Sequence, residues 1–205
     1  PVGSAASELL ITDRVEGFDP AMMALISEPD ACGGPLALTG VVIEGGTILA
    51  PLTDAEVAGS PTISANDTET PGQLLGVSNP NDLAVIRPTD RLTNRIQLAT
   101  LTTIRVGTPA SIVEIEGDEV TLRPGVVTSF GTREGSAYDF NVSTTFTDEG
   151  DAVSQAFPRG TFVLSASGDL LGMADNGGSF VTATRIAATV AQIQANPSFP
   201  QPVCR

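Results

Sequence analysis

The side chains that could perform acid–base or nucleophilic chemistry are few. The 205-residue chain contains no histidine, and its ten basic residues are all arginine. A serine or cysteine nucleophile normally needs a histidine or lysine as its base, and neither residue type is present. Hydroxyl groups such as those of Ser154 and Thr161 could therefore act only with a carboxylate partner.

Three acidic residues, Asp148, Glu149 and Asp151, lie together in one loop, residues 147–159. Such a group could exchange protons or coordinate Ca²⁺ through oxygen atoms, but the spacing matches no EF-hand loop. A solvated loop is the simpler interpretation, and we adopt it. The sequence also lacks a phosphate-binding glycine loop and a dinucleotide-binding fingerprint, so we expect neither a metal nor a cofactor.

Cys32 and Cys204 are the two cysteines, and their separation is not that of metal ligands. They could form a disulfide that ties the C-terminal tail to an early strand, or remain two free buried thiols. We prefer the disulfide, which would stabilise the fold by about 4–5 kcal/mol if unstrained. Since disulfides persist outside the reducing cytosol, this pairing predicts an extracytoplasmic protein, whether periplasmic, cell-envelope or secreted.

The charge of the chain excludes several classes of partner. Its net charge is -14, its pI is near 4.1 and its arginines are scattered, which argues against nucleic acids and anionic membrane surfaces. No apolar run approaches the roughly 20 residues of a membrane helix. The chain begins at Pro1 with no visible signal peptide, so we expect an excised part of a longer protein, compatible with an upstream signal or anchor.

Short strands are predicted along most of the chain. Residues 36–57 predict a hairpin that turns at Glu44-Gly45-Gly46, and residues 161–165 and 170–174 predict a second one. Residues 20–27 fit a helix start or a strand. Further strands are predicted at residues 61–65, 73–78, 110–116, 119–130, 137–146 and 179–183.

Three features should interrupt or end this series of strands. Residues 66–72 have the composition of a loop. Pro124 and Gly125 should mark a bend or an edge in the strand that contains them. Residues 184–195 carry apolar residues at helical spacing, with Thr184 as the expected N-cap of an amphipathic helix.

Three segments, residues 41–53, 80–88 and 161–186, resemble motifs of trypsin-like serine proteases, above all of the HtrA type. Residues 48–50 (ILA) resemble the I-L-T that precedes the catalytic histidine. Residues 82–88 (DLAVIRP) resemble the D-L-A-L-L-K-V strand that carries the triad aspartate. Residues 168–173 (GDLLGM) resemble the hairpin that follows the nucleophile, and the likeness spans residues 20–195.

Aligned on these motifs, the catalytic triad falls on Thr53, Asp82 and Arg159, so the histidine and the serine are both replaced. With no histidine to orient, we assign Asp82 a capping or turn role. Phe157-Pro158-Arg159 replaces the G-x-S core of the loop that forms the oxyanion hole. A bulky Phe157 stands where close backbone approach needs glycine, and the resemblance therefore implies a degenerate site.

The resemblance implies an all-β fold of two six-stranded antiparallel β-barrels, the trypsin-like (chymotrypsin) fold, with a C-terminal helix. We expect a single trypsin-like domain over residues 1–205. Its N-terminal half-barrel would span residues 8–98, its C-terminal half-barrel residues 99–183, its helix residues 184–195 and its tail residues 196–205.

We therefore expect a pseudoprotease, a non-catalytic serine protease homologue that serves as an extracytoplasmic protein-binding, peptide-binding or structural module. Arg159 is the candidate binding residue, for an acidic side chain or a C-terminal carboxylate of the partner. It could instead pair with the acidic residues of its own loop. The alternative function is a hydrolase with a rearranged active site without histidine, built on Ser154 or Thr161.

Overall fold

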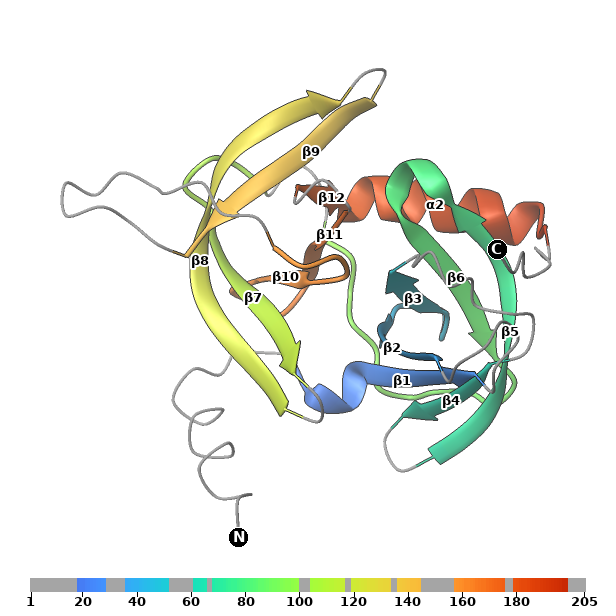
Figure 1. Cartoon of the computed structure of the whole chain (residues 1–205). Helices are drawn as coiled ribbons and strands as arrows, with labels where there is room; N and C mark the ends of the chain where they lie inside the picture. Colours follow the sequence, from blue (N-terminus) through green and yellow to red (C-terminus); the bar gives the residue numbers. More distant parts are fainter. Residues whose placement is uncertain are drawn as a thin grey trace, which may run out of the picture. The chain divides into compact units, whose positions relative to one another are not determined.

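Short runs of aliphatic and β-branched residues pair into strands through most of the described chain. The computed structural model describes residues 18–28, 36–51, 61–65, 68–99, 104–116, 119–133, 136–144, 157–175 and 179–198. These ranges contain twelve β-strands and one α-helix (Figure 1). The strands close into two separate six-stranded barrels, so the fold predicted from the sequence is confirmed.

The first barrel has the strand order β1-β2-β3-β6-β5-β4. Among the described residues its core is aliphatic, with buried side chains from every strand, among them Ile26, Ile48, Ile63, Leu74 and Ile86. Two glycines make its β2–β3 turn, as predicted, because Gly45 and Gly46 both adopt positive φ angles. The strands are β1 (Met23–Glu28), β2 (Leu36–Val42), β3 (Ile48–Pro51), β4 (Thr62–Ala65), β5 (Thr68–Ser78) and β6 (Leu83–Pro88).

Two sequence predictions for this barrel need adjustment. At residues 20–27, where the sequence fits a helix start or a strand and the resemblance favours the strand, a 3₁₀ helix at Pro20–Met22 precedes the strand β1. The loop predicted at residues 66–72 was wrong over most of its length, because β5 already begins at Thr68. Thr70 is buried and pairs with Ile63 of β4, so alternating threonines extend the strand through a stretch of turn-like composition.

The second barrel repeats the winding of the first, in the order β7-β8-β9-β12-β11-β10. Unlike the first, it has aromatic rings in its core. The rings of Phe140 and Phe180 are stacked with centroids 5.5 Å apart. Its strands are β7 (Pro109–Glu116), β8 (Glu119–Arg133), β9 (Ser136–Ser143), β10 (Phe162–Ser165), β11 (Leu170–Ala174) and β12 (Phe180–Thr182).

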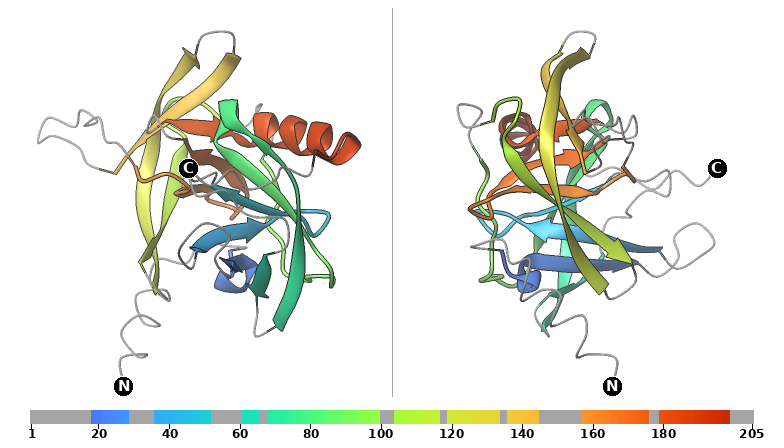
Figure 2. Two further views of the ribbon diagram at one scale, coloured as in Figure 1. Left: turned by 45° about the vertical axis from the view of Figure 1, so that its right-hand side comes forward. Right: turned by 90° about the vertical axis from the view of Figure 1, so that its left-hand side faces the viewer.

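β8 is one long strand, so Pro124 and Gly125 do not break it, but the expected edge is found: in the described chain they pair with β7 alone, because the pairing with β9 begins at Val126. Pro124 lies opposite Ser111 of β7 and is exposed, and the pairing continues on both sides of it. A side chain at position 125 would lie 2.9 Å from the carbonyl oxygen of Ser143, so glycine allows β9 to approach here. Figure 2 shows β8 and β9 together as a long hairpin.

The C-terminal helix is confirmed as α2 (Ala183–Ala195), but its expected N-cap was wrong. The helix begins one residue before Thr184, which lies exposed in the first turn. Thr182 is still paired with Gly172 of β11, so the strand passes into the helix without a loop. Ile186 and Val190 are buried, as the helical spacing predicted.

The chain divides into two compact units. One holds β1 to β6 and the other holds β7 to β12, while α2 is divided between them after Arg185. The chain passes from the first unit to the second between Gln97 and Leu98. Within the described ranges, no helix is long and apolar enough to cross a membrane.

Candidate functional site

Asp82, which the sequence resemblance aligns with the triad aspartate, forms a tight turn at the start of β6. It ends a 3₁₀ helix at Asn79–Asn81 and is the one described non-glycine residue with a positive φ, 53°. Its N–H donates to the carbonyl of Asn79 over 3.3 Å, and the residue is only 8% exposed. Aspartate tolerates this left-handed conformation better than most residues, so its type is suited to the turn itself.

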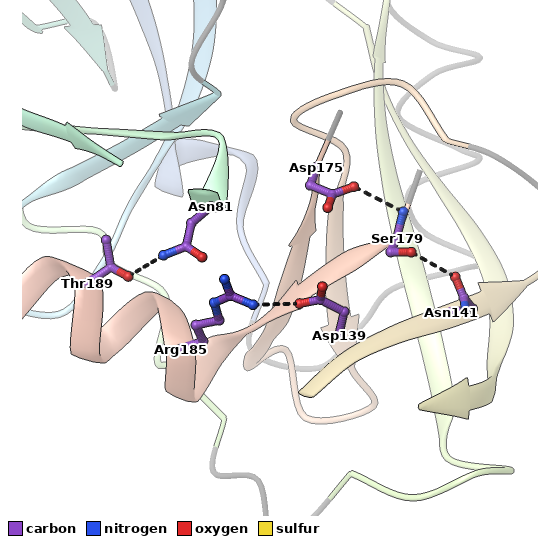
Figure 3. Close-up of polar contacts among 7 residues, drawn as sticks. All are labelled: Asn81, Asp139, Asn141, Asp175, Ser179, Arg185 and Thr189. Atoms are coloured by element: carbon purple, nitrogen blue, oxygen red, sulfur yellow. Dashed lines mark hydrogen bonds and ion pairs between the residues drawn. The ribbon is translucent and has the colours of Figure 1, made fainter. Parts of the chain in front are cut away.

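The neighbouring Asn81 makes a buried contact that sequence reasoning missed. Its Nδ2 donates to Oγ1 of Thr189 on α2 over 2.6 Å (Figure 3). One turn later in the same unit, Gln194 Nε2 donates to Oγ1 of Thr47 over 2.9 Å. These polar side chains fix the register of α2 against the first barrel.

Arg159, which the sequence resemblance aligns with the nucleophile, lies in a turn that leads into β10. The N–H of Thr161 donates to the carbonyl of Pro158 over 3.1 Å, and Gly160 adopts a φ of 81°. The N–H of Gly160 donates to the carbonyl of Ala174 over 3.0 Å, which joins this turn to β11. Arg159 is partly exposed and takes part in an interaction of its own. A cation therefore stands where the resemblance would place a nucleophile.

Phe157, two residues before Arg159, is a core residue of the second barrel. It is 5% exposed, and its ring centroid lies 5.3 Å from that of Phe180, with the planes inclined by 48°. From the sequence, we expected Phe157 to replace a glycine that the backbone of the oxyanion loop requires. In the structure, the side chain at this position fills the barrel interior and anchors the turn that follows it.

A partly buried ion pair joins β9 to the start of α2. Arg185 Nη1 lies 3.3 Å from Asp139 Oδ1, and the two side chains are 18% and 7% exposed (Figure 3). Nearby in the same view, Asp175 Oδ1 accepts from the N–H of Ser179, whose hydroxyl donates to Asn141 Oδ1. The sequence does contain a hint of this pair: Asp139 stands next to the buried Phe140 within a strand, where a charged residue needs a partner. Sequence reasoning missed it.

The rest of the predicted site can be placed only in part. Thr161 is buried, and its backbone is bonded to Pro158 and Ala174, which does not favour it as a nucleophile. In the described ranges, no group of three or more acidic, cysteine or histidine residues could hold a metal ion. Outside the described residues lie Thr53, Cys32, Cys204, Asp148, Glu149, Asp151 and Ser154.

Comparison with known proteins places this arrangement of two six-stranded barrels followed by a helix among solved structures. No family model and no curated protein sequence matches the chain. The active form of the protease Rv3671c from M. tuberculosis is 18% identical and superposes with a TM-score of 0.63, covering 98% of this chain and 89% of that one. The chain has the trypsin-like fold.

Other solved structures with the trypsin-like fold agree. The inactive form of Rv3671c, a serine-to-alanine mutant, gives a TM-score of 0.65 at 16% identity and covers 91% of this chain and 94% of that chain. The HtrA-type protease AlgW with a decapeptide gives 0.64 at 14% identity, covering 95% of this chain and 69% of that chain. At these identities the likeness concerns the trypsin-like fold, and it confirms the resemblance at that level.

Proposed function

We propose that this chain is a non-catalytic protein of the trypsin-like fold that binds a protein or peptide. The observation that carries the proposal is the turn at Arg159, which has an arginine at the nucleophile position and the buried Phe157 two residues before it. The absence of histidine and lysine from the whole sequence adds to it, because no ordinary base remains.

Arg159 is the residue we assign to partner binding. In a chain of net charge -14, the partly exposed Arg159, besides the interaction it already makes, is a local site for a carboxylate, which a guanidinium can hold through two parallel hydrogen bonds. Peptides are a reasonable partner class because AlgW, of the same fold, has been solved with a tripeptide and with a decapeptide. The competing proposal is that Arg159 pairs with Asp148, Glu149 or Asp151 of its own loop.

We further propose an extracytoplasmic location, in the periplasm, the cell envelope or outside the cell. The support comes from Cys32 and Cys204, which are far apart in sequence and lack metal-ligand spacing. We expect them to form a disulfide, which requires an oxidising compartment. A non-catalytic binding module and a structural module are both compatible with that location.

A fluorophosphonate probe tests the loss of catalysis directly, because it labels activated serine hydroxyls. The unmodified protein should show no labelling and no hydrolysis of peptide or ester substrates. Labelling that maps to Ser154, or turnover that is lost on Thr161→Ala, would instead establish the alternative, a hydrolase with a rearranged site.

Partner binding is tested with a peptide library immobilised with free or amidated C-termini. Arg159→Ala should weaken binding of carboxylate-bearing peptides by about 1–3 kcal/mol, roughly 5- to 150-fold. Arg105→Ala, which removes an exposed arginine of the same unit, is the matched control and should change nothing. Unchanged affinity together with faster proteolysis near residue 159 would favour internal pairing of Arg159.

A further inference from the structure

One side of β8 has no neighbouring strand along its second half in the described part of the chain. β7 pairs with β8 from Glu119 as far as Val126, whereas β9 pairs with it from Val126 to Arg133. Val127 still exchanges hydrogen bonds with Gly107 and Thr108. Figure 1 shows the end of the β8–β9 hairpin projecting beyond the other strands of its barrel. We call residues 128–133, on the side away from β9, the β8 edge.

The β8 edge lacks two of the features by which proteins protect exposed strands. Charged side chains and prolines are the usual protection, yet residues 128–132 include neither, and the first charge is that of Arg133. The pairing with β9 shifts register after Val127 and again after Gly131. Between the two shifts, Ser129, Phe130 and Gly131 keep regular pairing, which leaves a short regular stretch exposed.

Phe130 lies in the middle of this regular stretch and is 39% exposed. Two other large apolar residues of the described chain are more exposed, Leu25 at 46% and Val106 at 63%, but neither lies on an open strand. Leu25 has paired neighbours on both sides, Thr39 of β2 and Ser64 of β4. Phe130 therefore combines an exposed ring with an exposed backbone.

The ring of Phe130 and the strand beneath it are held in place by the barrel core. The ring centroid lies 6.4 Å from that of the fully buried Phe140. Asn141 of β9 donates from Nδ2 to Ser129 Oγ over 3.0 Å, and its carbonyl accepts from Thr128 Oγ1. A surface fixed in this way loses little conformational entropy when a partner binds.

We propose that the β8 edge binds an extended segment of a partner protein as an added strand. The backbone N–H and C=O groups of the edge would supply the hydrogen bonds, and a large apolar side chain of the segment would pack on Phe130. Since the chain carries a net charge of -14, the partner segment should be uncharged in its centre with basic flanks. The same charge makes a second copy of this chain an unfavourable occupant.

This proposal is independent of the function proposed for Arg159. Strand addition at the β8 edge involves no group of the Arg159 turn, so it could hold for an active or an inactive protein. The two proposals therefore fail separately, because one is tested with Arg159→Ala and the other with changes to Phe130.

A synthetic peptide of alternating threonine and valine, with a central tryptophan and a lysine at each end, is a suitable probe. The chain contains no tryptophan, so the emission of the peptide can be followed selectively. With the full chain at physiological salt, the peptide should bind saturably with a blue-shifted emission. N-methylation of alternate amides of the peptide should abolish binding, because it removes the strand hydrogen bonds.

Two variants of the protein complete the test. Phe130→Ser should weaken binding at least about tenfold, whereas Val106→Ser, at another exposed apolar residue of the same unit, should have no effect. Equal binding by Phe130→Ser, or by the N-methylated peptide, would overturn the proposal, as would failure of the unmodified protein to bind saturably. A dimer in sedimentation experiments that is lost on Phe130→Ser would also overturn it, since the edge would then bind a second copy.

Discussion

The rings of Phe157 and Phe180 pack with centroids 5.3 Å apart, in the interior of the second barrel. Phe157→Ala should therefore lower the free energy of unfolding by about 3–5 kcal/mol, the usual cost of removing a buried phenylalanine ring. Urea denaturation measures this change. Pro158→Ala, at the exposed next residue, is the control and should have a much smaller effect. A loss below about 1 kcal/mol for Phe157→Ala would mean that the ring does not anchor the turn.

Restoring the triad residues alone should not restore proteolysis. The double variant Thr53→His with Arg159→Ser supplies a base and a nucleophile at the positions that the sequence resemblance assigns to them. Phe157 still occupies the barrel core, at the position where that resemblance would place a glycine of the oxyanion loop. We expect turnover of a peptide ester to stay at the background rate. Measurable turnover that disappears on Asp82→Ala would show that the altered loop still stabilises an oxyanion.

The glycine at position 172 of β11 is required by close packing. A side chain there would collide with the carbonyl oxygen of Val181 and lie 2.7 Å from the ring of Phe140. Gly172→Ala should therefore cost about 1–3 kcal/mol of unfolding free energy, the range for overpacked cores. Gly131→Ala, at a strand position with nothing within 4 Å, is the matched control. Thermal melts of the two variants should differ clearly, and equal melts would refute this account.

The Asp139–Arg185 pair should show strong coupling in a double-mutant cycle. Arg185→Met removes one contact of the buried Asp139 carboxylate, and Asp139→Asn removes the charge facing the partly exposed Arg185, so each single variant should cost about 1–3 kcal/mol. The double variant should be less destabilised than the sum of the two, by roughly 0.5–3 kcal/mol. Urea titrations of the four proteins give these values. Simple additivity would indicate that the two side chains act independently.

The two cysteines should be joined in the native protein. Alkylation of Cys32 and Cys204 without reductant should leave the intact mass unchanged, and reduction should lower the unfolding free energy by about 4–5 kcal/mol. Mass spectrometry reads out the first result and urea denaturation the second. Rapid alkylation of both thiols in the folded protein would rule out the pairing and remove the main support for an extracytoplasmic location.

The strands were predictable from the sequence wherever short apolar runs end in glycine turns. Gly45-Gly46 and the turn before Leu170 are examples, because the conformation that each turn needs restricts the residue type. Prediction failed where pairing overrides local composition. Thr68 and Thr70 look like loop residues until β4 lies beside them. Pro124 does not break β8, because the pairing with β7 continues before and after it.

The candidate site was predictable only as positions along the chain. Matching motifs placed residues 82 and 159, but the burial of Phe157 and the bond between Asn81 and Thr189 depend on residues far apart in sequence. The Asp139–Arg185 pair joins residues 46 positions apart, and neither residue belongs to a recognisable motif. Long-range polar contacts of this kind become visible only once the barrel has brought their strands together.

The division of α2 after Arg185 has a consequence for the order in which the protein can fold during synthesis. The last strand of the first barrel ends at Pro88. The helix residues that lie against this barrel are synthesised roughly 100 residues later: Thr189 beside Asn81, Ile193 beside Gly76 and Gln194 beside Thr47. At roughly 5–20 residues per second, a ribosome needs about 5–20 s to reach them. During that interval the first barrel must wait without its helix, while the whole of the second barrel is being synthesised.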